Sequence, residues 1–245
     1  MFKSILRSFG IGGASIETVL STPQTVPGGE IAGEIRISGG DHEQDIRGVV
    51  LEILTRARVE TRGGDKVHAE ITLGEVTLHP GRIAARSRVN LPFRIRLPTS
   101  CPLTIGSTST VLKTRLDVAG AIDPTDTDSV QVLPTPAMDA VLHSVERAGF
   151  RLVETEVEYN PRRSNAFVQE FDFHPMRGGD WGIEEVEISF ASAPGGVEVL
   201  LTVDNRGGFF LPGRERTARF RVADAQTDHL DLASELRRAI NSLRR

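Results

Sequence analysis

The sequence predicts a mainly β protein made of two antiparallel β-sandwich domains, with a short helix between them and a second helix at the C-terminal end. Three observations support this prediction. Apolar and polar residues alternate over most of the chain, Gly- and Pro-bearing turns separate the alternating segments, and only two longer segments show helical spacing. Strands of this kind without intervening helices are typical of sandwiches, whereas parallel βαβ folds need long amphipathic crossovers.

Alternating segments predict the strands of the first domain. They are separated by turn sequences such as VPGGE and HPGR, and they cover residues 30–38, 48–61, 68–78, 82–97 and 109–118. In each of them one side chain in two can face a core. The N-terminal sandwich is therefore expected to span residues 1–134.

A change of period marks the end of this domain, in LPTPAMDAVLHSVERAGF (133–150). Thr135 suits a helix N-cap, Pro136 suits the first helical turn, and apolar residues then recur at helical spacing until Gly149. We expect residues 135–150 to form a linker helix.

Alternation resumes after this helix and predicts a C-terminal sandwich over 151–224, with strands at 151–159, 165–175, 184–191, 196–204 and 215–222. The last segment, 225–245, is expected to be a helix. Its apolar residues recur at helical spacing, at Leu236, Ala239, Ile240 and Leu243.

The composition is that of an ordinary globular chain. Of 245 residues, 39% are hydrophobic, 25% are charged and 5% are aromatic, and the net charge is −4. These values disfavour a disordered protein, and we expect no nucleic-acid partner, because phosphate binding needs a basic surface and single strands need aromatic platforms. No apolar run of about 18 residues occurs, so no transmembrane segment is expected. The single cysteine suits a reducing cytoplasm, which is the predicted location.

The residue patterns of common active sites and metal sites are missing from the sequence. The six histidines are scattered, no G-x-S-x-G elbow occurs, and Cys101 is flanked by Ser and Pro in a predicted turn. Zinc binding and nucleophilic catalysis need such constellations, and no glycine cluster has phosphate-loop spacing. We therefore assign no catalytic, cofactor-binding or metal-binding residue, expect no cofactor, and predict that the chain is not an enzyme.

The segment LDVAGAIDPTDTD (116–128) gathers several aspartates after a predicted strand. Pro124 interrupts the spacing of a calcium loop, and the glycine and glutamate of an EF-hand are missing. The favoured interpretation is a turn in which Asp123 accepts backbone hydrogen bonds and Pro124 fixes φ. Calcium binding by the Asp123–Asp128 loop and a charged contact between the two domains remain as alternatives.

Two apolar segments are candidates for contact with a partner or a membrane. Phe209, Phe210 and Leu211 lie between turn residues in NRGGFFLPGR (205–214), where they can form a contact site or fold over the end of the sheet. The N-terminal segment Phe2–Phe9 has an apolar helical face, but a helix this short binds membranes only marginally. Packing against the protein itself is the favoured interpretation of both segments.

Several segments resemble known families. LPFRIRLPTSCPLTIG (91–106) resembles the strand signature of arrestins. The bacterial sporulation-control family called sporulation stage zero protein M is similar to this chain, in order, at 8–20, 114–134, 145–152 and 167–175. The resemblance extends over nearly all of residues 1–222.

This resemblance implies an arrestin-like fold of two β-sandwiches and a regulatory, non-enzymatic role in sporulation or cell-cycle control, exerted through protein partners. By analogy with the charged residues between the sandwiches of arrestins, Arg115, Asp117 and Asp123 are expected to form polar contacts between the domains. Two alternative functions are a calcium-responsive binding module that uses the Asp123–Asp128 loop and a peripheral membrane adaptor that uses Phe2–Phe9 or Phe209–Leu211.

Overall fold

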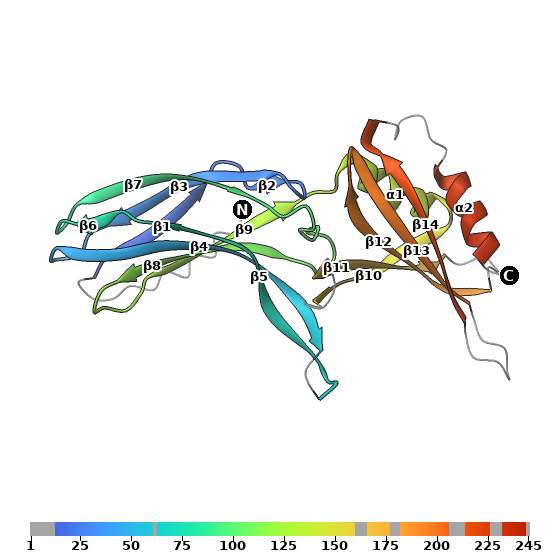
Figure 1. Cartoon of the computed structure of the whole chain (residues 1–245), viewed down its shortest axis with the longest axis horizontal. Helices are drawn as coiled ribbons and strands as arrows, with labels where there is room; N and C mark the ends of the chain where they lie inside the picture. The colour runs from blue at the N-terminus through green and yellow to red at the C-terminus, as the bar shows by residue number, and fades with distance from the viewer. Residues whose placement is uncertain are drawn as a thin grey trace. The chain divides into compact units, whose positions relative to one another are not determined.

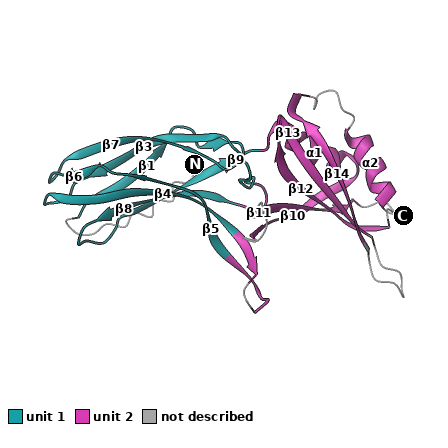
Figure 2. Cartoon of the chain, in the orientation of Figure 1, with its two compact units in different colours: residues 1–56, 69–104, 109–133 teal, residues 57–68, 105–108, 134–245 magenta. Residues whose placement is uncertain are grey.

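The structure is a computed structural model, and it describes residues 13–60, 63–159, 166–176, 182–205, 214–225 and 232–243. Most of these residues lie in strands, as Figure 1 shows, so the predicted mainly β class is confirmed. The chain divides into two compact units, coloured in Figure 2. Unit 1 comprises Met1–Arg56, Ala69–Thr104 and Ser109–Leu133, and unit 2 comprises Ala57–His68, Ile105–Thr108 and Pro134–Arg245.

Unit 1 contains two sheets. The first has the order β1-β3-β7, formed by β1 (Ser15–Leu20), β3 (Glu30–Ser38) and β7 (Arg88–Arg96). The second has the order β4-β8-β9-β2, formed by β4 (Gln44–Glu60), β8 (Thr110–Val118), β9 (Thr125–Val132) and β2 (Gln24–Thr25). Two further strands pair with β4, namely β5 (Lys66–Leu78) and β6 (Gly81–Ile83). The ends of β4 and β5, from residue 57 to residue 68, belong to unit 2.

The two sheets of unit 1 bury apolar faces against each other. Ile35 on β3, Leu51 on β4 and Leu112 on β8 are completely buried. Between the sheets, the Thr18 hydroxyl on β1 donates a hydrogen bond of 2.8 Å to the Thr114 hydroxyl on β8, so these buried polar groups are paired. The alternation in the sequence therefore reflects strands with one core face, as the sandwich prediction requires.

Unit 2 contains an antiparallel meander with the strand order β14-β13-β12-β11-β10. Its strands are β10 (Phe150–Tyr159), β11 (Phe167–Pro175), β12 (Ile183–Ala193), β13 (Gly196–Asn205) and β14 (Arg214–Ala223). The end of β4 adds a short parallel bridge to β10, in which Arg58 is the partner of Glu158 and Val59 is the partner of Tyr159. The sheet thus brings five consecutive strands and one distant hairpin end together.

The covering layer of unit 2 is made by two helices in place of a second sheet. α1 (Pro136–Arg147) contacts β10 and β13, α2 (Leu232–Leu243) contacts β14, and the helices contact each other (Figure 1). Each strand of this meander has only one apolar face. One layer therefore completes the core, and the opposite face of the sheet remains polar.

The ends of α1 follow the signals predicted from the sequence. The Thr135 hydroxyl accepts a hydrogen bond of 3.4 Å from the Met138 N–H, and Pro136 occupies the first helical turn. After the C-cap Ala148, Gly149 adopts a φ of 106° that favours glycine. The predicted C-terminal helix is also present, and Leu232, Leu236 and Ile240 form its buried stripe.

The buried stripe of α2 gives a direct test of this layer. Leu236→Ala should lower the free energy of unfolding by about 2–5 kcal/mol, because it leaves a cavity in place of a side chain that is only 1% exposed. Urea denaturation followed by far-UV circular dichroism measures this loss. Leu243→Ala, at the more accessible end of the same helix, is the matched control and should cost less than half as much. Equal losses would contradict the packing described.

Candidate functional site

The sheet of unit 2 has one apolar face and one acidic face. The apolar side chains of successive strands are at most 2% exposed and lie under the helices; they include Val157, Phe171, Phe173, Val186, Ile188, Leu201 and Val203. Because side chains alternate along a strand, the residues between them point to the other side. We call that side the acidic sheet face, and it carries Glu154, Glu156, Glu158, Glu170, Asp172, Glu185, Glu187, Asp204 and Glu215.

The strand register places carboxylates directly opposite one another. Glu170 is the partner of Glu156, and Asp172 has a glutamate on both sides, Glu154 on β10 and Glu187 on β12. Directly opposed residues on one sheet face have Cβ atoms about 5 Å apart, and like charges in this position destabilise a sheet. The arrangement is therefore unfavourable for stability and calls for a functional explanation.

Burial and mutual repulsion change the protonation of this face. Partial burial, followed by the charges of neighbouring carboxylates, raises the pKa of Glu170 and of Glu187 to about 7. The same two causes raise the pKa of Asp172 to about 6. Half-buried carboxyl groups in this cluster therefore hold protons near neutral pH.

Arg58 forms three ion pairs with carboxylates of this face. Its guanidinium forms ion pairs with Glu156, with Glu158 at 2.5 Å and with Glu170 at 4.0 Å. Its side chain is 26% exposed, and burial opposes its charge, but the carboxylates outweigh burial and raise the pKa of Arg58. The ion pairs attach the end of β4 to β10 and β11 of unit 2.

Two more basic groups lie at the beginning of β5. The Lys66 ammonium lies 3.9 Å from a carboxylate oxygen of Glu158, and the His68 imidazole lies 3.4 Å from Glu156. At the other end of the face, His174 lies 3.3 Å from Glu185. Among the residues that the structure describes, no basic side chain forms an ion pair with Asp172, Glu187, Asp204 or Glu215. Arg219 and Arg221 of β14 lie on the same face as Glu215, and Arg219 pairs with Glu198 at 3.8 Å. The carboxylates of Asp172, Glu187, Asp204 and Glu215 lie between these arginines and the cations beside β10, without an ion pair of their own among the described residues.

The residues predicted as polar contacts between the domains make local contacts in unit 1. Arg115 pairs with Asp123 at 3.0 Å, and Asp123 also accepts a hydrogen bond of 3.0 Å from the Val118 N–H. Asp117 pairs with Arg47, which donates a hydrogen bond of 2.8 Å from Nε. The contacts of Asp123 agree with the turn interpretation of this segment, and a role of these side chains between the domains remains a prediction.

Asp126 and Asp128, the remaining aspartates of this segment, lie on β9 of unit 1. Asp126 accepts a hydrogen bond of 2.6 Å from the Thr18 N–H. Burial, and then the charges of Asp126 and Glu17, raises the pKa of Asp128 to about 6. Within the described residues, no three His, Cys, Asp or Glu side chains are grouped so that they could hold a metal ion.

The apolar candidates Phe209, Phe210 and Leu211 and the segment Phe2–Phe9 lie outside the described residues. Their proposed contacts with a partner or a membrane remain predictions. In the part of the chain that is described, no helix has both the length and the apolar character needed to cross a bilayer.

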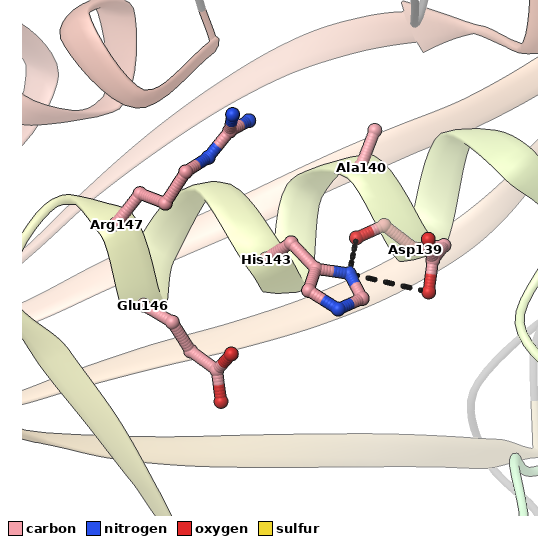
Figure 3. A pocket seen from close by; sticks show the side chains of 5 residues that line it. All are labelled: Asp139, Ala140, His143, Glu146 and Arg147. Carbon is pink, nitrogen blue, oxygen red and sulfur yellow. Dashed lines mark hydrogen bonds and ion pairs between the residues drawn. The ribbon is translucent and has the colours of Figure 1, made fainter.

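A surface pocket and the single cysteine are the other places where reactive side chains occur among the described residues. An open pocket on α1 is lined by Asp139, Ala140, His143, Glu146 and Arg147 (Figure 3). In this pocket His143 Nδ1 lies 2.9 Å from the Asp139 carbonyl oxygen and 3.3 Å from its carboxylate. Arg147 donates a hydrogen bond of 3.2 Å to the Ser144 hydroxyl, and Glu146 and Arg147 point apart. Cys101 is buried, and burial raises its pKa to about 12, so its thiol is a poor nucleophile. Neither feature assembles a nucleophile with a base.

Known proteins resemble this chain in sequence and in structure. The sequence model of the SpoOM protein family matches residues 2–207. The chain belongs to the Spo0M family. The sporulation-control protein spo0M of Bacillus subtilis strain 168 is 34% identical over 213 residues, which cover 84% of this chain and 81% of that protein. The crystal structure of Spo0M from Bacillus subtilis matches with a TM-score of 0.82 and 29% identity, over 95% of this chain and 100% of that chain. The predicted family resemblance is therefore confirmed, and the fold is that of a Spo0M protein.

The contribution of the Arg58 ion pairs to stability can be measured by removing the guanidinium group. Arg58→Ala should lower the free energy of unfolding at pH 7 by about 1–3 kcal/mol, because half-buried carboxylates lose their partner. The loss of stability should be smaller at pH 5, because Glu170 is then protonated and carries no charge for Arg58 to neutralise. Urea denaturation at both pH values measures it. Arg94→Ala removes an exposed ion pair with Glu30 in unit 1 and should change stability by less than about 0.5 kcal/mol. A loss at Arg58 no larger than this control would contradict the structural role of Arg58.

Proposed function

We propose that this chain is a non-catalytic regulatory protein that acts in the cytoplasm, in sporulation or cell-cycle control, by binding a protein partner through the acidic sheet face. The partner segment that fits this face is basic, with lysine and arginine side chains that pair with the carboxylates beside β12, β13 and β14. The regulatory role is supported by family membership, since the related Bacillus subtilis protein is named a sporulation-control protein.

The observation that carries this proposal is the uneven charge of one sheet face. The helices cover the apolar face of the unit 2 sheet, whereas the opposite face carries carboxylates on all five strands of the meander. Arg58, Lys66 and His68 compensate carboxylates of β10, and His174 and Arg219 contact Glu185 and Glu198, but among the described residues none of these cations pairs with Glu187, Asp204 or Glu215. A basic segment on the remaining side would relieve repulsion that the fold leaves in place, and charge complementarity of this kind accelerates association and selects partners.

A non-catalytic mechanism is supported by the chemistry of the same residues. Carboxylates that repel one another and accept ion pairs from Arg58 can bind cations without any bond being made or broken. The thiol of Cys101 is buried, and the pKa of about 12 keeps it protonated. These residues therefore support binding of a cationic partner and no chemical reaction.

Charge reversal on the uncompensated side tests the proposal. Replacing both Glu187 and Glu215 with Lys should weaken binding of a fluorescent decalysine peptide by roughly tenfold or more at pH 7.5, because two ion pairs become two repulsions. Fluorescence anisotropy with the full chain measures the affinity. The wild-type affinity should also fall with added salt.

The matched control is Glu184→Lys, on the same strand as Glu187. Glu184 is exposed and lies outside the acidic sheet face, beside the irregular register of β12. This substitution should change the affinity by less than about twofold. An equal loss in the control, or no binding of decalysine by the wild-type chain at low salt, would overturn the proposed function.

A further inference from the structure

Three carboxyl groups at the centre of the acidic sheet face are immediate neighbours. Asp172 on β11 lies directly opposite Glu187 on β12, and Glu170 lies two residues before Asp172 on the same face of β11. Residues that oppose each other in an antiparallel pair have Cβ atoms about 5 Å apart. Two ionised carboxylates at this spacing repel each other, and a shared proton removes the repulsion.

The groups that surround this centre are mostly acidic. β10 contributes Glu154, Glu156 and Glu158, which act on Glu170 and Asp172. From the other side, Glu185 on β12 acts on both Asp172 and Glu187, and Glu215 on β14 acts on Glu187. Asp204 on β13 lies between Glu185 and Glu215 in the strand register. Each strand of the meander therefore contributes at least one carboxylate to the surroundings of the three groups, and β14 also carries Arg219 and Arg221 further along the same face.

The cations that face the cluster sit at its margins. Arg58 reaches Glu170 only at 4.0 Å and is shared with Glu156 and Glu158. Lys66 and His68 contact the carboxylates of β10, and His174 contacts Glu185. Arg219, on β14, pairs with Glu198 at 3.8 Å. Among the described side chains, then, none of these cations forms an ion pair with Asp172 or Glu187.

We propose that the acidic sheet face is a proton-responsive surface, in which Glu170, Asp172 and Glu187 take up protons near neutral pH and so reduce its negative charge and its hold on a basic partner. The part that concerns the partner rests on the proposed function, whereas proton uptake rests on the cluster alone.

The protonation equilibria support this geometry. Burial and neighbouring charges raise the pKa of Glu170 and Glu187 from 4.5 to about 7, and that of Asp172 from 3.8 to about 6. The folded state thus binds more protons than the unfolded chain between about pH 4 and pH 7. Over this window the stability contributed by the three groups falls as the pH rises, and above it the full repulsion remains. Between pH 8 and pH 6 the face loses negative charge that ordinary carboxylates would keep.

Proton uptake is tested without any partner. Carbon-13 NMR of the glutamate carboxyl groups, assigned by comparison with Glu187→Gln, should show that Glu187 titrates near pH 7. Glu187→Gln should raise the midpoint of thermal unfolding by roughly 2–4 °C at pH 8, and the difference from wild type should vanish by pH 5. Glu184→Gln, at an exposed position of the same strand, should leave the midpoint unchanged at both pH values. Titration of Glu187 in the ordinary range near pH 4.5, or a stabilisation that does not depend on pH, would overturn the proposal.

The partner half of the proposal is tested with decalysine that is acetylated at its N-terminus. The charge of this peptide is constant between pH 6 and pH 8, because its α-amino group is blocked and the pKa of its lysine side chains is about 10.4. Wild-type affinity should fall roughly two- to five-fold for each carboxylate that becomes protonated, from pH 8 to pH 6. A variant with His68→Gln and His174→Gln should keep this dependence, which separates the carboxyl groups from the histidines. Binding that is equal at pH 6 and pH 8 would overturn the regulation while leaving the proposed function intact. Absence of binding at every pH would overturn the proposed function and the partner half, and the NMR titration would still decide proton uptake.

Discussion

The guanidinium group of Arg58 lies among three carboxylates that come from two neighbouring strands of unit 2. Its two terminal nitrogens contact different carboxylates, Nη1 that of Glu156 and Nη2 that of Glu158. A planar fork of donors suits this geometry, whereas a lysine would offer a single point charge. The parallel bridge between β4 and β10 is only two residue pairs long. The ion pairs of Arg58 are therefore a principal interaction that holds the end of β4 to this sheet.

The same cluster explains why the sheet can carry so much like charge. The apolar face of each strand is buried under α1 and α2, and burial of side chains such as Phe171 and Phe173 supplies the stability of the unit. The opposite face can then be unfavourable without unfolding the unit. Sequences selected for stability alone place opposite charges across strands. Asp172 is flanked by glutamates on both sides, so this part of the face lowers stability, and the buried apolar face has to offset that cost.

Local features of the fold could be predicted from the sequence because their causes act over a few residues. Alternation predicts strands, Thr135 and Gly149 set the ends of α1, and the turn at Asp123 depends on its neighbours Val118 and Pro124. The resemblance to the Spo0M family was recognisable for the same reason, since short ordered segments carry it.

The acidic sheet face could not be predicted in the same way. Its carboxylates lie at every second position in segments such as ETEVE (154–158) and EVE (185–187), a pattern that any solvent-facing strand shows. Only the register of the meander reveals that these segments lie side by side, and only the tertiary structure brings Arg58 to them across about 100 residues of chain. The helical layer over the other face is likewise a tertiary feature, because an apolar strand face does not specify what covers it.

Glu170 connects the compensated and the uncompensated parts of this face. It contacts Arg58 on one side, and on the other it is repelled by Glu187 and Asp172. A cation that approaches Glu187 would favour ionisation there and lower its pKa, and the added charge would in turn act on Glu170. By linkage, a ligand that lowers the pKa of a half-protonated group must release protons when it binds. Protonation of that group must in turn lower the affinity for the ligand to the same extent. Fold similarity alone carries no such consequence. It follows from the chemistry of these side chains, because binding of a basic segment and proton release are two views of one equilibrium on this face.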